Sequence, residues 1–374
     1  MSLFDGRVRK DNAGLFTVEA ADGALLCCRA ATRLRNGGQG VKPGDLVRGE
    51  DNGDGTGFIT AVLPRRNDFI RPSVCNIDLL VIAVSASTPA TPLYNIDKQT
   101  ALAALNGADC CIAVTKHDTE TDGAQTELLR RVYTQAGCEV VVTSAATGEG
   151  VDALRRRLEG RVSAFSGASG VGKSSLMNAL YPAFSAQVGE ISGRIARGRN
   201  TTRLTELFKA GPSTYVADTP GFTMLDLVRY DIIPLERIHD AFPDLRPYMD
   251  RCRYRKCTHT GEDGCAVAAA VEQGLASEER WESFCRMYGE LKAKKTLLRE
   301  RVSIRVYWVL QHSQPRHPAR TGLVRARLLQ RDERQHQDGR GYVSAGRPLR
   351  YVRRQNRAEY ENALGAREAV RRAD

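Results

Sequence analysis

Apolar and polar positions divide the chain into stretches with different periods. In residues 1–66, short runs that alternate apolar and polar side chains lie between Gly, Asn and Asp turns, at 14–19, 24–29, 45–50 and 57–62. A period of two over short runs predicts half-buried strands joined by tight turns. The first 66 residues are therefore expected to form a small β-barrel of the OB-fold type.

From residue 78 the pattern changes to uninterrupted apolar runs. These runs lie at 79–84, 111–114, 139–142, 162–165 and 214–217, and between them apolar residues recur three and four positions apart, at 97–105, 124–135, 151–158 and 173–180. Uninterrupted runs are typical of buried parallel strands, and the longer spacing is typical of the helices that connect them. An α/β nucleotide-binding domain is predicted over 67–229.

Two further stretches follow the α/β pattern. Residues 230–300 contain a helical segment, a cysteine cluster and a charged helix pattern, and are expected to form a small helical domain held by a metal. Residues 301–374 carry 17 Arg, no Lys and 7 Asp or Glu. High charge with few aliphatic residues predicts a disordered or loosely ordered arm that contacts RNA.

Charge narrows the class of partner. The net charge of +11 and the isoelectric point near 9.3 favour a polyanion, either nucleic acid or an anionic membrane. The barrel contributes Arg7, Arg9, Lys10, Arg33, Arg35 and Lys42 to this charge, and binds oligonucleotides or serves only as a structural lid. No uncharged apolar run approaches the roughly 18 residues of a membrane span, so a cytoplasmic protein without a membrane partner is expected.

A phosphate-binding loop follows the apolar run at 162–165 and opens the helix pattern at 173–180. The motif G-x-x-x-x-G-K-[ST] comprises Gly167, Ala168, Ser169, Gly170, Val171, Gly172, Lys173 and Ser174, with Ser175 next to it. Backbone N–H groups surround the phosphates, Lys173 reaches the β and γ phosphates, and Ser174 offers a hydroxyl to Mg²⁺. The alternative is a Gly-rich turn without ligand, which the strand and helix on either side disfavour.

Two downstream segments complete a nucleotide switch. Asp218-Thr-Pro-Gly221 follows an apolar run, so Asp218 is expected to hold Mg²⁺ through water and Gly221 to sense the γ-phosphate. The basic stretch 193–202 ends in Thr201 and Thr202, either of which completes Mg²⁺ coordination if the stretch is a switch rather than a surface loop.

Two upstream segments resemble the guanine motifs of GTPases. Thr115, Lys116, His117 and Asp118 stand for N-K-x-D, and Thr143, Ser144 and Ala145 stand for the S-A-x motif. In GTPases, the Asp accepts two hydrogen bonds from guanine, the Lys stem covers the base, and the Ala N–H meets O6, a pattern that rejects adenine. Thr115 replaces the usual Asn, so the brace between this loop and the phosphate loop is expected to be shortened or lost.

The cysteine cluster has the composition of a structural zinc site. Cys252, Cys257, His259 and Cys265 group three thiolates and one imidazole within 14 residues. The alternative is a chance group of reduced cysteines, which the surrounding Arg251, Arg253, Arg255 and Lys256 disfavour. We expect one Zn²⁺ per chain.

The order of these motifs, with base recognition before the phosphate loop, resembles the RsgA family of circularly permuted GTPases. The resemblance covers about residues 5–300, including Ile70-Arg-Pro72, the segment 197–202 and the zinc motif, although Asn200 stands where the family has His. It implies a monomeric GTPase that binds GTP and GDP, acts on the small ribosomal subunit and its rRNA in late maturation, and is activated by that subunit. A nucleotide-gated RNA-binding module with incidental hydrolysis remains the alternative, and a kinase is disfavoured by the paired base motifs.

Overall fold

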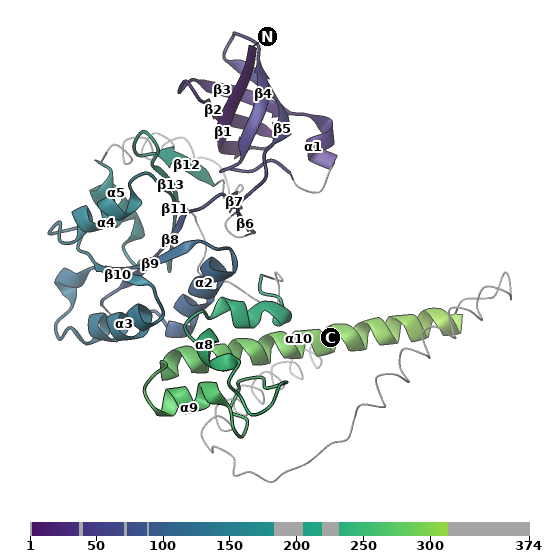
Figure 1. Ribbon diagram of the computed structural model, residues 1–374. Coiled ribbons are helices and arrows are strands. Elements are labelled where there is room, and N and C mark those ends of the chain that lie inside the picture. Colours follow the sequence, from purple (N-terminus) through teal and green to yellow (C-terminus); the bar gives the residue numbers. More distant parts are fainter. Residues whose placement is uncertain are drawn as a thin grey trace, which may run out of the picture. The chain divides into compact units, whose positions relative to one another are not determined.

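The computed structural model describes residues 2–36, 40–70, 73–87, 90–182, 205–218 and 232–312 (Figure 1). Of residues 35, 36, 218 and 297–312 it describes the backbone alone. The chain divides into two compact units, Met1–Glu300 and Arg301–Asp374. Everything that follows concerns the first unit, except the end of one helix that continues past residue 300.

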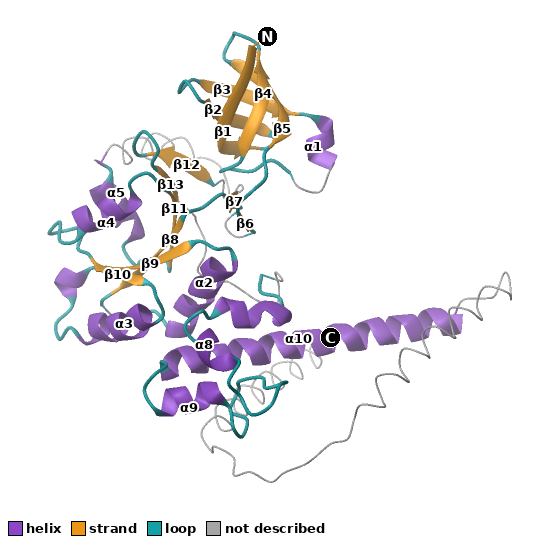
Figure 2. Ribbon diagram, viewed as in Figure 1, coloured by secondary structure: helices purple, strands orange, loops and turns teal. Residues whose placement is uncertain are grey.

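Five strands form the N-terminal barrel (Figure 2). They are β1 (Ser2–Asn12), β2 (Leu15–Ala20), β3 (Leu25–Ala30), β4 (Leu46–Asp51) and β5 (Thr56–Val62), with helix α1 (Thr32–Asn36) between β3 and β4. Their order is β1-β2-β3-β5-β4, and β4 also pairs with β1, so the barrel closes. Alternate residues point inward, and Val8, Phe16, Val18, Val47 and Ile59 fill the interior. The predicted barrel is confirmed, but the sequence pattern had missed β1.

The α/β domain has six strands in the order β10-β9-β8-β11-β13-β12. They are β8 (Leu79–Ser85), β9 (Asp109–Thr115), β10 (Glu139–Val142), β11 (Val162–Gly167), β12 (Glu206–Lys209) and β13 (Tyr215–Asp218), and only β12 is antiparallel to its neighbour within this group. The helices are α2 (Leu93–Leu105), α3 (Ala124–Gln135), α4 (Val151–Leu158) and α5 (Lys173–Leu180). Three of the four helices have the predicted bounds. Helix α2 begins earlier than predicted, directly after Pro92, because its first turn also contributes apolar residues to the core.

A short hairpin and a C-terminal module complete the first unit. Strands β6 (Asp68–Phe69) and β7 (Val74–Cys75) form the hairpin between the barrel and β8. The module consists of the 3-10 helix η3 (Leu235–Ala241) and helices α8 (Arg246–Met249), α9 (Ala266–Glu272) and α10 (Glu278–His312). Helix α10 therefore continues past the predicted domain boundary at residue 300, and no Gly or Pro interrupts it over 301–312. Residues 313–374 lie outside the described part.

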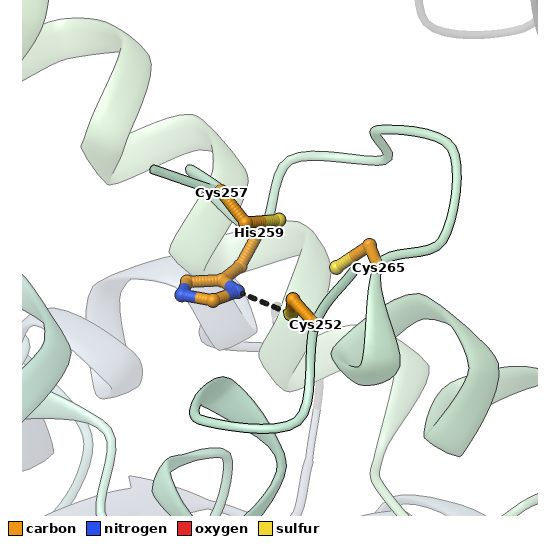
Figure 3. Close-up of side chains that lie close together, drawn as sticks. All are labelled: Cys252, Cys257, His259 and Cys265. Carbon is orange, nitrogen blue, oxygen red and sulfur yellow. Dashed lines mark hydrogen bonds between the residues drawn. The ribbon is translucent and has the colours of Figure 1, made fainter. Parts of the chain in front are cut away.

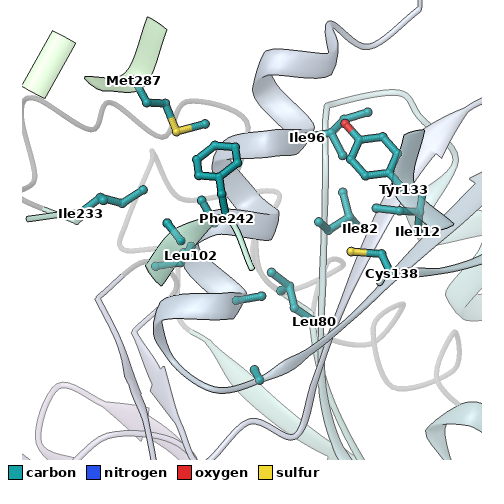
Figure 4. Close-up of a cluster of buried hydrophobic side chains, with 14 of the residues drawn as sticks. Leu80, Ile82, Ile96, Leu102, Ile112, Tyr133, Cys138, Ile233, Phe242 and Met287 are labelled. Carbon is teal, nitrogen blue, oxygen red and sulfur yellow. The ribbon is translucent and has the colours of Figure 1, made fainter. Parts of the chain in front are cut away.

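One hydrophobic core joins the C-terminal module to the α/β sheet (Figure 4). Leu80 and Ile82 extend from β8, Leu102 from α2, Phe242 from the segment after η3, and Met287 from α10. The rings of Phe242 and Phe284 meet edge to face with centroids 5.4 Å apart. The opposite face of the sheet packs against α4 and α5 through a separate cluster. Among the described residues, no helix combines the length and apolar character that crossing a membrane requires.

Candidate functional site

The phosphate loop occupies the turn between β11 and α5, as its motif requires. Gly167 ends the strand with φ 146°, and a Cβ there would lie 2.5 Å from the Ala83 carbonyl oxygen, so no larger residue fits. Gly172 has φ 96° and precedes Lys173, the first residue of α5. The loop from Ala168 to Gly172 therefore lies at the positive end of a helix dipole, a position that favours phosphate.

The base-recognition loop is tied to the phosphate loop by two hydrogen bonds. The Thr115 hydroxyl donates to the carbonyl oxygen of Val171 and also lies 3.2 Å from that of Val84. Lys116, in a left-handed conformation with φ 57°, donates from Nζ to the Gly170 carbonyl oxygen at 2.7 Å. Of the two expected outcomes for the brace at Thr115, a shortened or a lost link, the loss was wrong, because β9 ends close enough to the phosphate loop for a hydroxyl to reach it.

Asp118 is held in place by the second base motif. The Ser144 hydroxyl donates to Asp118 Oδ1 at 2.5 Å and accepts hydrogen bonds from the backbone N–H groups of Ala146 and Thr147, both at 3.2 Å. Asp118 lies in the 3-10 helix η1 (His117–Thr119), where His117 Nδ1 is 2.9 Å from a Glu149 oxygen. The two loops that follow β9 and β10 thus orient one carboxylate beside the phosphate loop.

The switch residues are only partly described. Asp218 is the last residue of β13, and its backbone is in register with Phe165 of β11 on one side and Glu206 of β12 on the other. This register places Asp218 next to the strand that ends in the phosphate loop. Thr201, Thr202 and Gly221 lie outside the described residues, and so does the side chain of Asp218.

The structure brings the predicted metal ligands together (Figure 3). One ligand atom from each of Cys252, Cys257, His259 and Cys265 lies within 4.8 Å of all the others, and Cys252 Sγ is 3.3 Å from His259 Nδ1. The buried His259 has φ 58°, and its carbonyl oxygen accepts a 2.7 Å hydrogen bond from the Trp281 indole. The left-handed backbone conformation and the hydrogen bond from Trp281 thus hold the imidazole toward the thiols.

The chemistry of this cluster fits a zinc ion. Burial raises the pKa values of the Cys257 and Cys265 thiols, because a buried thiolate without a cation is costly. A divalent cation reverses that cost by binding thiolates. Burial also acts to raise the pKa of Glu262, but hydrogen bonds from Thr258 and from the Thr260 backbone lower it to about 2. Glu262 therefore stays ionised and organises the loop between two of the ligands.

Several basic residues that the sequence offered to RNA are engaged within the protein. Lys42 pairs with Asp68, Lys10 with Glu206 and Arg9 with Glu19, while Arg7 lies over the ring of Tyr215. The partners of Lys42 and Lys10 lie 26 and 196 residues away, so the charge pattern alone could not reveal these pairs. Of that set, Arg33 remains exposed and donates to the Thr60 carbonyl oxygen.

Comparison with known proteins places this site in a family. The model of the RsgA GTPase family matches residues 62–228. A Moorella thermoacetica protein named small ribosomal subunit biogenesis GTPase RsgA is 37% identical over 291 residues, which are 78% of this chain and 98% of that protein. A Halalkalibacterium halodurans protein of the same name is 36% identical over 293 residues, 77% of this chain and 97% of that protein.

Solved structures agree with these matches. YjeQ from Thermotoga maritima superposes with a TM-score of 0.65 at 30% identity, over 78% of this chain and 99% of that chain. YloQ, described as a circularly permuted GTPase, gives a TM-score of 0.64 at 27% identity, over 78% of this chain and 96% of that chain. The predicted family and enzyme class are confirmed: the chain belongs to the RsgA family of circularly permuted GTPases.

Proposed function

We propose that this GTPase binds the small ribosomal subunit, assists its late maturation, and hydrolyses GTP to GDP and phosphate faster when bound there. The observation that carries the proposal is the direct hydrogen bonding between the guanine loop and the phosphate loop. Hydrogen bonds from Thr115 and Lys116 to the phosphate loop hold Asp118 at a fixed place beside it, so guanine and phosphates are recognised by one rigid unit. Its relatives carry the name of a small-subunit biogenesis GTPase.

The roles of individual residues follow from their positions. Asp118 accepts hydrogen bonds from guanine, the Lys116 stem covers the base, and the backbone around Ser144 and Ala145 meets its O6. Lys173 and the loop N–H groups bind the phosphates, and Ser174 contributes to Mg²⁺ binding. We assign Thr201, Thr202, Asp218 and Gly221 to the γ-phosphate and Mg²⁺ side of the site.

The domain organisation is part of the proposal. We infer an OB-fold barrel over 1–66, the permuted GTPase domain over 67–229, a helical domain with one structural Zn²⁺ over 230–300, and an arm beyond it. Cys252, Cys257, His259 and Cys265 would hold the zinc ion, which would supply folding energy and no catalytic chemistry. The exposed Tyr254, with Arg253 over its ring at 5.5 Å, offers a stacking surface for a base of rRNA. The enzyme acts as a monomer.

Slow hydrolysis without the subunit is expected from Phe222. This residue follows the Asp218-x-x-Gly221 motif, where many GTPases carry a Gln that orients the attacking water, and an apolar side chain does not orient water. The subunit then supplies the missing positioning, which accounts for most catalysis of phosphoryl transfer.

Turnover of GTP with and without purified small subunits tests the function. Subunits should raise kcat strongly, Lys173→Ala should abolish turnover, and Thr201→Ala or Thr202→Ala should lose the stimulation while retaining GDP binding. Fast hydrolysis that subunits leave unchanged would indicate a self-sufficient GTPase with another role. Stoichiometric binding to subunits without any stimulation would favour the RNA-binding module instead.

The base pocket is tested separately by Asp118→Asn. The new amide donates where guanine also donates, so GTP affinity should fall and affinity for xanthosine triphosphate should rise. Equal binding of both nucleotides by the variant and the unchanged protein would refute the assignment of Asp118.

A further inference from the structure

The first barrel strand touches the GTPase sheet at its antiparallel edge. Lys10 of β1 is in antiparallel register with Glu206 of β12, and Glu206 is in register with Asp218 of β13. Asp218 is in turn in register with Phe165 of β11, the strand that leads into the phosphate loop. One row of residues therefore connects the barrel to the two strands that carry the nucleotide site.

Side chains reinforce this row on both sides. Lys10 Nζ lies 2.5 Å from a Glu206 carboxylate oxygen, with the two side chains 27% and 25% exposed. Arg9 donates from Nε to the Leu207 carbonyl oxygen and pairs with Glu19 at 2.8 Å, and Lys209 pairs with the other Glu19 oxygen. We call this set the barrel junction: Arg7, Arg9, Lys10 and Glu19 from the barrel, and Glu206, Leu207, Lys209 and Tyr215 from the GTPase sheet.

The barrel junction consists mainly of polar contacts. Its contacts are charge-assisted hydrogen bonds, a short strand pairing, and guanidinium groups of Arg7 and Arg9 that lie 5.1 and 5.7 Å from the centroid of the Tyr215 ring. Such contacts are directional, so they fix the position and register of β12. They are polar, so they can exchange their hydrogen bonds with water at small net cost.

Strand β12 is the element whose position matters for hydrolysis. It pairs with β13, the strand that ends in Asp218, and β13 pairs in turn with the strand that leads into the phosphate loop. The guanine and phosphate loops, in contrast, follow β9, β10 and β11 and are held by hydrogen bonds to one another. A change at the barrel junction therefore reaches the hydrolytic side of the site, while GDP binding depends on other loops.

We propose that the barrel is a positioning element for GTP hydrolysis, in which Lys10 and Arg9 hold β12 and, through it, the register of β13, the strand that ends at Asp218. A partner that binds the barrel then acts on kcat through this junction. The inference rests on the proposed role of Asp218. It assigns Lys10, Arg9 and Glu206 as positioning residues without contact to the nucleotide.

Charge reversal across the Lys10 and Glu206 pair tests the proposal. Lys10→Glu and Glu206→Lys should each lower kcat about tenfold while the Kd for GDP changes by less than about twofold, because a repelled pair displaces β12 only. The double variant, Lys10→Glu with Glu206→Lys, should recover most of kcat. Either single variant with unchanged kcat, or a double variant as slow as the singles, would overturn the proposal.

Controls separate this reading from its alternatives. Arg48 and Asp5 form a barrel ion pair of the same kind, 64% and 61% exposed and remote from β12, so Arg48→Glu should leave kcat unchanged. If Lys10 acted by contacting RNA, Glu206→Lys would keep or strengthen the stimulation of kcat by small subunits. If Lys10 acts through the barrel junction, Glu206→Lys should weaken that stimulation. Lys10→Met and Glu206→Gln repeat the test without reversal if a reversed variant fails to fold.

The result is also separable from the proposed function. All variants are measured with and without small subunits. If the unchanged protein shows no stimulation, the proposed activation is refuted, but the pattern of kcat values without subunits still decides whether the barrel junction positions the site.

Discussion

The GTPase sheet is joined to its two neighbours in opposite ways. The C-terminal module shares a continuous hydrophobic core with one face of the sheet, and the barrel meets the sheet's antiparallel edge through charged side chains and one strand pairing. An apolar core resists separation in proportion to the area it buries, whereas a polar junction exchanges its hydrogen bonds with water at small net cost. The C-terminal module is therefore a fixed part of the GTPase, whereas the proposed role of the barrel requires a junction that a partner can adjust.

A buried ion cluster strengthens the fixed attachment. Arg280 of α10 is 1% exposed and donates to Asp97 of α2 at 2.8 Å, to Thr100 at 2.7 Å, and to Asp244 at 2.9 and 3.0 Å. Burial opposes its charge, but Asp97 and Asp244 hold the pKa of Arg280 above its ordinary value. Buried ion clusters of this kind specify one docking geometry more than they add stability.

Among the predicted changes, removal of the metal should have the largest effect on the stability of the C-terminal module. Cys257→Ser should abolish binding of about one zinc per chain and unfold much of 235–295, because the ligand loops carry little apolar surface of their own. GTP binding should remain largely intact, since both nucleotide loops belong to the sheet. Metal analysis and nucleotide titration check both statements.

Cys285 provides the matched control for the metal site. Its thiol lies 3.8 Å from the His259 carbonyl oxygen, beside the cluster but outside the ligand set. Cys285→Ser should keep the full zinc content. Protein purified under reducing conditions without any metal would refute the site.

Loss of the Arg280 ion cluster should have the second largest effect on the free energy of unfolding. Arg280→Ala leaves Asp97 and Asp244 buried without a partner, so we expect a loss of about 3–5 kcal/mol in the free energy of unfolding. The exposed pair of Arg131 and Glu279 links the same two regions, and Arg131→Ala should cost below about 1 kcal/mol. Urea unfolding measures both values.

A compensated variant sharpens the test. Arg280→Met combined with Asp97→Leu and Asp244→Leu removes all three charges and should recover most of the stability. If Arg280→Ala cost no more than Arg131→Ala, the cluster would contribute nothing to the attachment.

Only part of the fold and of the two attachments to the GTPase sheet, that of the C-terminal module and that of the barrel, could be predicted from the sequence. Period and motif predicted α3, α4 and α5 to the residue, and they predicted the phosphate loop, because these features depend on local spacing. Strand β1 escaped detection because only Val8 and the partly buried Phe4 pack into the barrel core, while most of its other side chains are polar. The partners of Lys10 and Arg280 lie 196 and 183 residues away, a separation that no local pattern can encode.

The hydrogen bond from Thr115 to the phosphate loop could not be predicted for a related reason. A motif compares residue types, whereas the hydrogen bond to Val171 depends on how closely β9 approaches the phosphate loop in three dimensions. The zinc ligands, in contrast, lie within 14 residues of one another, so their spacing was sufficient to identify them.

Weakening the barrel junction should have a smaller effect on stability. Glu19 is 5% exposed and accepts from Arg9 and Lys209, so Glu19→Gln should lower the free energy of unfolding by about 1 kcal/mol near neutral pH. Burial acts to raise the pKa of Glu19, but these hydrogen bonds lower it below the ordinary 4.5. A lowered pKa stabilises the fold above about pH 4.5, and that gain is lost as the pH falls through the folded value. The difference between Glu19→Gln and the unchanged protein should therefore shrink in acid, and a constant difference would exclude an ionised Glu19.

Deletion of residues 313–374 should change stability least. The Moorella relative is matched over 98% of its length by 291 residues of this chain, a length close to that of the first compact unit, so the family fold needs no counterpart of the arm. The deletion should leave the unfolding midpoint and kcat at saturating subunits unchanged, whereas deletion from residue 278 removes Arg280, Phe284 and Met287 and should unfold the C-terminal module. If the arm contacts rRNA, its loss should lower subunit affinity and flatten the dependence of that affinity on salt, because each Arg on a phosphate releases bound counterions. An unfolding midpoint lowered by the shorter deletion would show that the arm belongs to the folded unit, and the fixed part of the molecule would then extend beyond His312.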